Sequence, residues 1–278
     1  MTDEKTEAKA AVIPEATAVP PVPAVVVLPV SKDEVVADVP LGISKYKEFD
    51  SSNWNPKTSL GKKVKAGEIT DIDEILDKGL KILEPEIVDM LVPNLESDLF
   101  QVGQSKGKFG GGKRSIWRQT QKKTKEGNKP SFGALAVVGN RNGYVGIGAG
   151  KSKETVPARE KALRNAKLNL IKIRRGSGSW QDTSGTPNTI PIMQTGRCGS
   201  VRLKLIPAPR GTNLCLESEC QKLLRLAGIK DIYSKSYGHT TTKLNMIKAC
   251  FDALQKVAKA KLSDSYKKMT GTVDGRLV

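Results

Sequence analysis

The segment "GNRNGYVGIGAGKSKE", residues 139–154, has the composition of a loop that holds phosphate. It is rich in glycine, and its letters GKS at 150–152 match the end of the nucleotide-binding pattern G-x-x-x-x-G-K-[ST]. The first glycine of that pattern would have to stand at position 145, where the chain has Val145. The segment also belongs to a predicted hairpin, whereas a phosphate loop follows a strand of a parallel sheet. Spacing and context therefore argue against a nucleotide site.

Gly146, Gly148 and Gly150 alternate along this segment, so they line one face of the predicted strand. Glycine in a strand permits close approach by another backbone or by a ligand. Two compatible interpretations follow: a helix packs over this face, or a polyanion approaches it. Lys151 and Lys153 come next, at the start of a predicted helix, where free backbone amides favour phosphate.

A strongly basic segment, "QSKGKFGGGKRSIWRQTQKKTKEGNKP" at 104–130, precedes these strands. It has one acidic residue, Glu126, against nine cations: Lys106, Lys108, Lys113, Arg114, Arg118, Lys122, Lys123, Lys125 and Lys129. Its glycines suit a flexible arm that follows a phosphate backbone and displaces condensed counterions. Phe109 could stack on an unpaired base. Trp117 could stack as well or anchor the loop by packing, and the sequence leaves both roles open.

The charge of the whole chain supports a polyanionic partner. The formal net charge of the 278 residues is +17, and an excess of this size indicates nucleic acid before other partners. Residues 1–100 carry 11 Lys/Arg and 19 Asp/Glu, whereas residues 101–278 carry 35 and 10. The polyanion therefore binds mainly after residue 101.

The cysteines and the hydropathy pattern further narrow the class of protein to which the chain can belong. Cys198, Cys215, Cys220 and Cys250 show no C-x-x-C spacing, and the single His239 does not stand in a Cys/His cluster, so no metal site is predicted. Scattered thiols are typical of a reduced, intracellular chain. No apolar run approaches the ~18–20 residues of a membrane span, and the first residues do not read as a secretory signal. No membrane partner and no cofactor are therefore expected.

The helices and strands that position the basic residues are predicted from hydrophobic periodicity and from capping, glycine and proline residues. Short helices are predicted within 54–95, with Asp71 or Asp73 as a cap, Gly79 as a stop and Pro85 opening the next helix. The apolar runs "SFGALAVVGN" and "GYVGIGAG" predict two strands around the turn letters "NRNG". A helix follows from about Pro157, with an alanine- and leucine-rich stripe on one side. Its cations are expected elsewhere on its surface: Lys153, Arg159, Lys161, Arg164 and Lys167.

A second folded region is predicted after a Gly/Ser/Thr/Pro-rich stretch at 174–196. It begins with the strand "SVRLKLIPAPRG". The helix "LESECQKLLRLAG" then stops at Gly228, the strand "IKDIYSKSYG" follows, and a long helix starts after a cap at Thr240–Thr242. Two β-α units form a small α+β domain.

Several segments together resemble one family, ribosomal protein S-five of the small subunit, known as S-two in eukaryotes. They are "GALAVVGNRNGYVGIGAGKSKE", "AKLNLIKIRRGSGSW", "TGRCGSVRLKLIPAPRG" and "LLRLAGIKDIYSKSYGHTTTKLNMIKACFDAL". The resemblance covers roughly residues 54–260 in order. The upstream segment "WNPKTSLGKKVKAGEITDIDEILDKGLKILEPEIVDMLVP" is similar to the archaeal and eukaryotic branch, and "GSGSWQ" leans archaeal.

The resemblance implies an α+β fold of two domains: a double-stranded-RNA-binding-like α/β sandwich, followed by a βαβα domain like domain two of ribosomal protein S-five. It implies a structural constituent of the small ribosomal subunit in the cytoplasm, without catalysis. The implied partners are small-subunit ribosomal RNA, messenger RNA at the entry channel, and ribosomal protein S-four with other small-subunit proteins. The surface shared with S-four is expected to influence translational accuracy.

The resemblance also extends the set of predicted RNA-binding residues beyond the nine cations of the basic segment. Matches in the glycine-rich hairpin, the linker and the "PAPRG" motif add Arg141, Lys151, Lys153, Arg174, Arg175, Arg197 and Arg210. Residues 104–118 resemble an insertion, so their role cannot be taken from the family. "QDTSGTP" stands where some archaeal relatives have cysteines, which argues against a metal there.

The expected organisation has six parts: a disordered Pro/Ala/Val-rich tail at 1–40, a helical extension at 41–95, the RNA-binding-like domain with its basic insertion at 96–173, a linker at 174–198, the C-terminal domain at 199–262, and a tail at 263–278. Two other functions are weighed against the ribosomal one. They are a free double-stranded-RNA-binding protein acting off the ribosome, and an enzyme such as a nucleotidase or kinase centred on Lys151.

Overall fold

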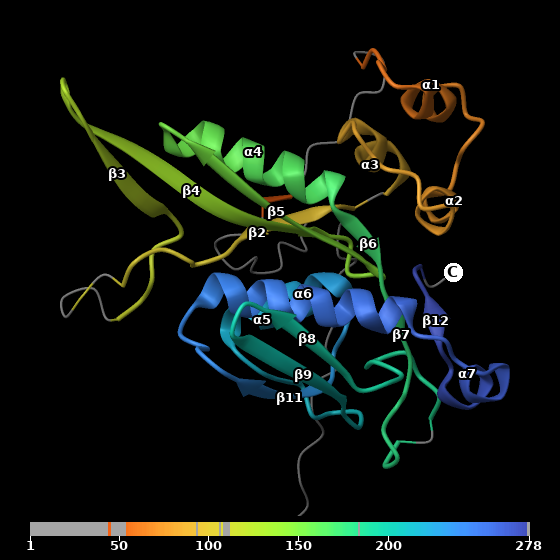
Figure 1. The fold of residues 1–278 in the computed structure, drawn as a ribbon. Coiled ribbons are helices and arrows are strands. Elements are labelled where there is room, and N and C mark those ends of the chain that lie inside the picture. Colours follow the sequence, from red (N-terminus) through yellow and green to blue (C-terminus); the bar gives the residue numbers. More distant parts are fainter. Residues whose placement is uncertain are drawn as a thin grey trace, which may run out of the picture. The chain divides into compact units, whose positions relative to one another are not determined.

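The computed structural model describes residues 44–45, 54–92, 94–105, 107, 112–182 and 184–276, all within one compact unit that spans Pro40–Val278 (Figure 1). The predicted tail at 1–40 lies outside the described residues, as do Phe109 and two cations of the basic segment, Lys106 and Lys108. Within the described part, no helix is long and apolar enough to cross a membrane.

Helices combine with largely antiparallel sheets, as in an α+β fold. The helices are α1 (Ser59–Lys65), α2 (Ile72–Asp77), α3 (Glu86–Leu91), α4 (Thr155–Leu168), α5 (Ser218–Ala227), α6 (Lys243–Lys259) and α7 (Asp264–Thr270). The strands are β1 (Ser44–Lys45), β2 (Glu96–Leu99), β3 (Arg118–Thr124), β4 (Gly127–Gly139), β5 (Tyr144–Ser152), β6 (Leu170–Lys172), β7 (Arg174–Arg175), β8 (Gln194–Cys198), β9 (Val201–Pro207), β10 (Leu214–Cys215), β11 (Ile232–Tyr237) and β12 (Val273–Asp274).

The first sheet has the strand order β1-β2-β4-β5-β6, with β3 paired to the outer half of β4. Its long strands are antiparallel, and the predicted "NRNG" turn joins β4 to β5 with Arg141 and Gly143 both at positive φ. Helix α4 packs on one face of this sheet, and the buried Ala158, Ala162 and Ala166 form its inner stripe. The predicted strand–strand–helix order is therefore confirmed.

The glycine face of β5 lies directly beneath α4. A methyl group on Gly148 would lie 2.1 Å from the backbone nitrogen of Ala166, and one on Gly150 would lie 2.3 Å from the carbonyl oxygen of Ala158. The helix backbone thus occupies the space that the missing side chains leave free. Of the two interpretations, helix packing is confirmed. The approach of a polyanion to this face is corrected, because α4 fills it.

The opposite face of the first sheet packs on the C-terminal half of the chain. Leu135 and Val137 of β4 belong to the same buried cluster as Leu223 of α5 and Ile247 of α6. Figure 1 shows α5 and α6 lying between the two sheets. The two sheets therefore share one core, which fixes the first sheet relative to the second.

The second sheet has the order β10-β11-β9-β8, and its inner face buries Val201, Leu203 and Leu205 against α5 and α6. Helix α5 ends at Gly228, which adopts φ 84° as its predicted role as a stop requires. Thr242 is the N-cap residue of α6, although its hydroxyl donates to the His239 carbonyl instead of capping an amide. Strand β8 falls inside the predicted linker.

The N-terminal extension and the C-terminal segment add packing around this core. The extension, which contains helices α1 to α3, contributes Trp54, Ile75 and Ile87 to a second buried cluster, which also includes Val138 of β4 and Leu170 of β6. Lys167, expected to face outward on α4, is instead buried and pairs with Asp89 of α3 at 2.7 Å. The predicted tail at 263–278 contains α7 and β12, and β12 pairs with β7.

Candidate nucleic-acid interface

The outer half of the β3–β4 hairpin is the most exposed regular structure in the first sheet. Six of the seven residues of β3 are exposed, and β4 becomes buried only from Ala134 onward. A two-residue loop joins the strands, with Gly127 at φ 114° after it. In Figure 1 this hairpin projects beyond the end of α4. The projecting hairpin carries most of the described cations of the basic segment.

Strand register places four predicted cations on one side of this hairpin. Lys122 lies directly opposite Lys129, and Arg118 and Lys151 flank Gly133 from the two neighbouring strands. We call these four residues, Arg118, Lys122, Lys129 and Lys151, the hairpin face. All four are exposed. Their common side follows from the alternation of side chains along paired strands.

The hairpin face concentrates positive charge that, among the described residues, is offset by one exposed ion pair. Opposed side chains on paired strands lie about 5 Å apart, so Lys122 and Lys129 repel each other. This ion pair joins Lys129 to Glu126 at 3.2 Å, and both side chains are more than half exposed. Exposed pairs of this kind contribute little to stability. Gly133 leaves open space between Arg118 and Lys151, because a methyl group there would meet nothing closer than 3.7 Å. The face is suited to accept a chain of phosphates.

Other predicted cations surround the hairpin face without joining it. Lys123 points to the opposite side of β3, Lys125 lies in the loop, Lys153 follows β5, and Lys113 precedes β3; all four are exposed. They extend the basic surface around the hairpin in several directions.

The part of the basic segment before β3 is held by the protein. Trp117 is partly buried and packs against a cluster formed by Ala134, Ala136 and Ala162, so the packing role is the one the structure supports. Arg114 donates to the Thr241 carbonyl at 3.2 Å, at the start of α6. These contacts anchor the segment from which β3 departs.

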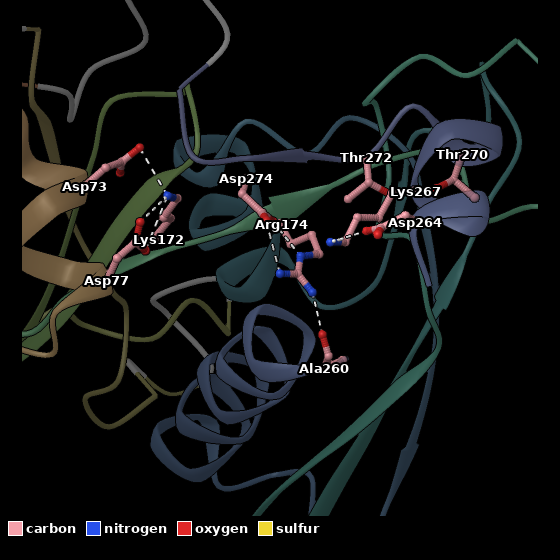
Figure 2. A network of polar contacts seen from close by, with 10 residues as sticks. All are labelled: Asp73, Asp77, Lys172, Arg174, Ala260, Asp264, Lys267, Thr270, Thr272 and Asp274. Atoms are coloured by element: carbon pink, nitrogen blue, oxygen red, sulfur yellow. Dashed lines mark hydrogen bonds and ion pairs between the residues drawn. The ribbon is translucent and has the colours of Figure 1, made fainter. Parts of the chain in front are cut away.

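Arg174 and Arg175 were predicted to bind RNA, but in the structure both guanidinium groups have partners within the chain. Arg174 makes a bidentate ion pair with Asp274 and donates to the Ala260 carbonyl, as Figure 2 shows. Arg175 is 2% exposed and donates to the Asn142 amide oxygen and the Gly275 carbonyl, at 2.8 and 2.9 Å. Burial lowers the pKa of Arg175. Both guanidinium groups hold the C-terminal segment against β7.

The same region ties the N-terminal extension to the first sheet. Lys172 of β6 lies between Asp73 and Asp77 of the extension, 3.2 Å from a carboxylate oxygen of each (Figure 2). The Tyr144 hydroxyl donates to the other oxygen of Asp73 at 2.6 Å. Burial and this hydrogen bond raise the pKa of Tyr144 above its usual value. We call two sets of contacts the joint: those of Lys172 and Tyr144 with Asp73 and Asp77, and the ion pair of Arg174 with Asp274.

The remaining predicted residues fall in two places. Arg141 and Arg210 line a cleft of about 1030 Å³ together with Arg175, and Arg141 pairs with Glu96 at 2.8 Å. Arg197 lies at the end of β8, exposed and far from that cleft in the sheet order. Among the described residues of the predicted set, the hairpin face gathers four, and the others lie elsewhere on the protein.

The sequence also contains a pattern that indicates a further basic surface, which the predicted set of RNA-binding residues largely omits. Cations and tyrosines stand at alternate positions of "VRLKLI" in β9 and "IYSKSY" in β11, which places them on the outer side of the second sheet. Of this group, only Arg197 on the neighbouring β8 had been predicted.

Comparisons with known proteins agree with this architecture. Residues 116–174 match the family model "Ribosomal protein S5, N-terminal domain", and residues 196–268 match "Ribosomal protein S5, C-terminal domain". The protein "Small ribosomal subunit protein uS5" of Nanoarchaeum equitans is 46% identical over 225 residues, which cover 81% of this chain and 96% of the relative. The protein of that name from Methanocaldococcus jannaschii is 43% identical over 230 residues, covering 83% and 99%. The one from Methanosphaera stadtmanae is 46% identical over 226 residues, covering 81% and 93%.

Proposed function

We infer the function from one premise: this chain belongs to the ribosomal protein S5 family. Its relatives carry the name of a small-ribosomal-subunit protein and align over nearly their whole length. The chain is accordingly a structural constituent of the small ribosomal subunit that binds ribosomal RNA. The near-complete alignment carries this conclusion, since it includes both halves of the shared core.

The hairpin face supplies the RNA contact in this proposal. Its four cations bind backbone phosphates and release condensed counterions, which gives affinity without reading sequence. A rigid core behind an exposed basic hairpin suits recognition of a folded RNA by shape. The protein then acts by holding RNA in place.

The finer placement follows the family resemblance. We propose that the chain lies beside the messenger entry channel, contacts ribosomal protein S-four, and supports translational accuracy through that contact. Cross-linking from the hairpin face in assembled subunits tests this placement, because it reports which RNA and which protein lie within reach.

A catalytic function has no support in the geometry around Lys151. This lysine lies within antiparallel β5, exposed and opposite Gly133, whereas a phosphate loop leaves its strand and wraps the phosphates. We therefore propose that the chain is not an enzyme. ATP turnover that is abolished by Lys151→Ala would contradict this.

Sucrose-gradient sedimentation of lysates from growing cells tests the function directly. The chain is expected in the small-subunit peak and in whole ribosomes. The competing function, a free double-stranded-RNA-binding protein, predicts that the chain stays near the top of the gradient and binds unrelated duplexes tightly at physiological salt. Absence from the small-subunit peak would overturn the ribosomal function.

A further inference from the structure

The outer side of the second sheet is another surface where cations gather in register. Arg197, Arg202 and Tyr237 stand in one row across β8, β9 and β11. Thr195, Lys204 and Lys235 form the next row, and Ile206 and Tyr233 form a third. We call the seven polar residues of these rows the platform: Thr195, Arg197, Arg202, Lys204, Tyr233, Lys235 and Tyr237.

The platform is one continuous face, because its residues alternate with those that face the core. Leu203 and Leu205 of β9 are fully buried, while Arg202 between the buried positions is exposed. Gly196 of β8 faces α6 so closely that a methyl group there would lie 1.9 Å from the Ala249 carbonyl oxygen. The helices α5 and α6 therefore cover the inner face, whereas Arg202, Tyr233 and Tyr237 on the outer face are exposed.

The charge of the platform is uncompensated within the described part of the chain. Arg197, Arg202, Lys204 and Lys235 make no ion pair there, and no carboxylate stands on the outer positions of β8, β9 or β11. Asp252 reaches the edge of β8 but accepts from the backbone N–H of Arg197 and pairs with Lys256 of α6. Four cations on a sheet face that carries no acidic side chain favour binding of a polyanion over binding of a protein surface of mixed charge.

Two tyrosines distinguish the platform from the hairpin face, which has no aromatic residue. Tyr233 and Tyr237 are 41% and 53% exposed, unusually open for large rings that folding could bury. They stand four residues apart on β11, about 13 Å along the strand, with Lys235 midway. Exposed rings on a sheet stack unpaired bases, and interleaved cations bind the phosphates between those bases.

From these rows we propose that the platform is a second RNA-binding surface, specific for unpaired nucleotides, in which Tyr233 and Tyr237 stack on bases and the four cations bind the backbone. It rests on the proposed function and extends it, since it assigns single-stranded RNA to one sheet and folded RNA to the other. Bases inside a duplex offer no free faces, so duplex RNA does not gain the stacking contacts.

Binding by the purified full-length chain tests the stacking. The probes are a fluorescein-labelled oligouridine of about 12 nucleotides and a duplex of similar length, each measured at low and high salt. Tyr233→Ala with Tyr237→Ala is expected to raise the Kd for oligouridine at least about tenfold and to leave the duplex Kd within about twofold. Tyr233→Phe with Tyr237→Phe keeps the rings and is expected to keep the affinity. High salt weakens phosphate contacts, so the difference between the alanine and phenylalanine variants should persist there.

Three outcomes of that measurement overturn the inference: an unchanged oligouridine Kd in the alanine variant, an equal loss in the phenylalanine variant, or an equal loss for duplex RNA. Thermal unfolding of each variant checks that the fold is intact. The tyrosines are surface residues, so a large drop in Tm would itself contradict an open platform.

A cross-link within assembled subunits tests the occupant independently. Cys215 is exposed on β10 and lies opposite Tyr233 in the sheet, whereas Cys220 and Cys250 are fully buried. A benzophenone maleimide on Cys215, in a Cys198→Ser background, is expected to cross-link to RNA. Cross-links to protein alone, or none, overturn the inference. Sedimentation of the unlabelled chain tests the proposed function separately: if that chain sediments with the small subunit, the function stands whatever the label cross-links, and if it does not, the function itself fails.

Discussion

Strand β4 passes through two environments, and the difference separates packing from binding. Its outer half, Gly127–Gly133, is paired with β3 and exposed or partly exposed; its inner half, Ala134–Gly139, is buried between α4 on one face and the C-terminal helices on the other. The inner half is alanine, leucine, valine and glycine, and the outer half carries Lys129 and Pro130. Pro130 is tolerated because β5 pairs with β4 only from Phe132 onward, so no second strand needs its missing amide.

One strand can therefore be part of the packed core at one end and an exposed ligand-binding surface at the other. Burial on both faces makes every atom of the inner half part of a close-packed core. The outer half has no such constraint, so substitutions there should change RNA affinity and leave stability almost unchanged. Substitutions in the two regions test whether effects on RNA affinity and on stability separate in this way.

The largest effect is expected from Gly148→Ala in the covered part of β5. The added methyl group would lie 2.1 and 2.4 Å from backbone atoms of Ala166 and Ala162, and a helix backbone cannot move aside as a flexible side chain can. We expect a loss of about 3 kcal/mol or more in the free energy of unfolding, measured by urea denaturation. A loss below about 1 kcal/mol would show that α4 is packed loosely on this face.

The double substitution Lys122→Ala with Lys129→Ala tests the exposed end. We expect the Kd for a 20-bp RNA duplex at about 0.1 M salt to rise roughly tenfold, and the slope of log Kd against log salt to fall by about 2. Tm should not fall, because the two lysines repel each other across the strands. The matched control is Lys78→Ala with Lys81→Ala in the extension. Equal loss of affinity in the control would mean that the hairpin face has no special role.

An intermediate effect is expected at the joint from Tyr144→Phe. Losing the hydrogen bond to Asp73 should cost about 1 kcal/mol near pH 7. The folded state raises the pKa of Tyr144, so the folded chain holds this proton more tightly than the unfolded chain. The stability that the hydroxyl contributes is therefore fully present below pH ~10 and declines as pH rises above that value.

Thermal unfolding at pH 8 and pH 11 checks this pH dependence. The wild-type chain should exceed Tyr144→Phe in Tm at pH 8, and the gap should narrow at pH 11. A gap that widens with pH would contradict the sign of the shift. Differences between the two chains isolate Tyr144 from the other groups that titrate in this range.

The smallest effect is expected from Gly133→Ala, at the boundary between the two halves of β4. Its nearest contact would be 3.7 Å, an ordinary van der Waals distance, and its φ is not in the left-handed region. The free energy of unfolding should change by less than about 0.5 kcal/mol, in the same urea titration as Gly148→Ala. A loss as large as that of Gly148→Ala would remove the distinction between the two parts of the sheet.

The sequence allowed much of the scaffold to be predicted because the relevant signals are local. The alternating glycines of β5, the alanine stripe of α4 and the left-handed stop at Gly228 act within a few residues of themselves. Strand β8 was assigned to the linker because "QTGRC" has little apolar character; its structure comes from pairing with β9 and from Gly196 beneath α6.

The site was harder to predict because a cation's role depends on distant partners. Lys122 and Arg175 both stand in basic surroundings in the sequence, yet one is exposed and the other is buried against Gly275, a hundred residues later. No local sequence pattern predicts a partner so distant in the chain. The platform was missed for another reason: its members are spread over three strands, and only the register brings them into rows.

The pairing of β7 with β12 sets an order of events while the protein is being made. The carboxylate that holds Arg174 belongs to Asp274, a hundred residues further along the chain. At about 5 to 20 residues per second, β7 waits roughly 5 to 20 s after its own synthesis before that partner exists. During this interval the first sheet can pair and α4 can cover it, while the arginines of β7 have neither of their C-terminal partners. The ion pair of Arg174 with Asp274 therefore forms late, and a chain arrested in that interval would leave both arginines of β7 without the C-terminal partners that they have in the finished protein.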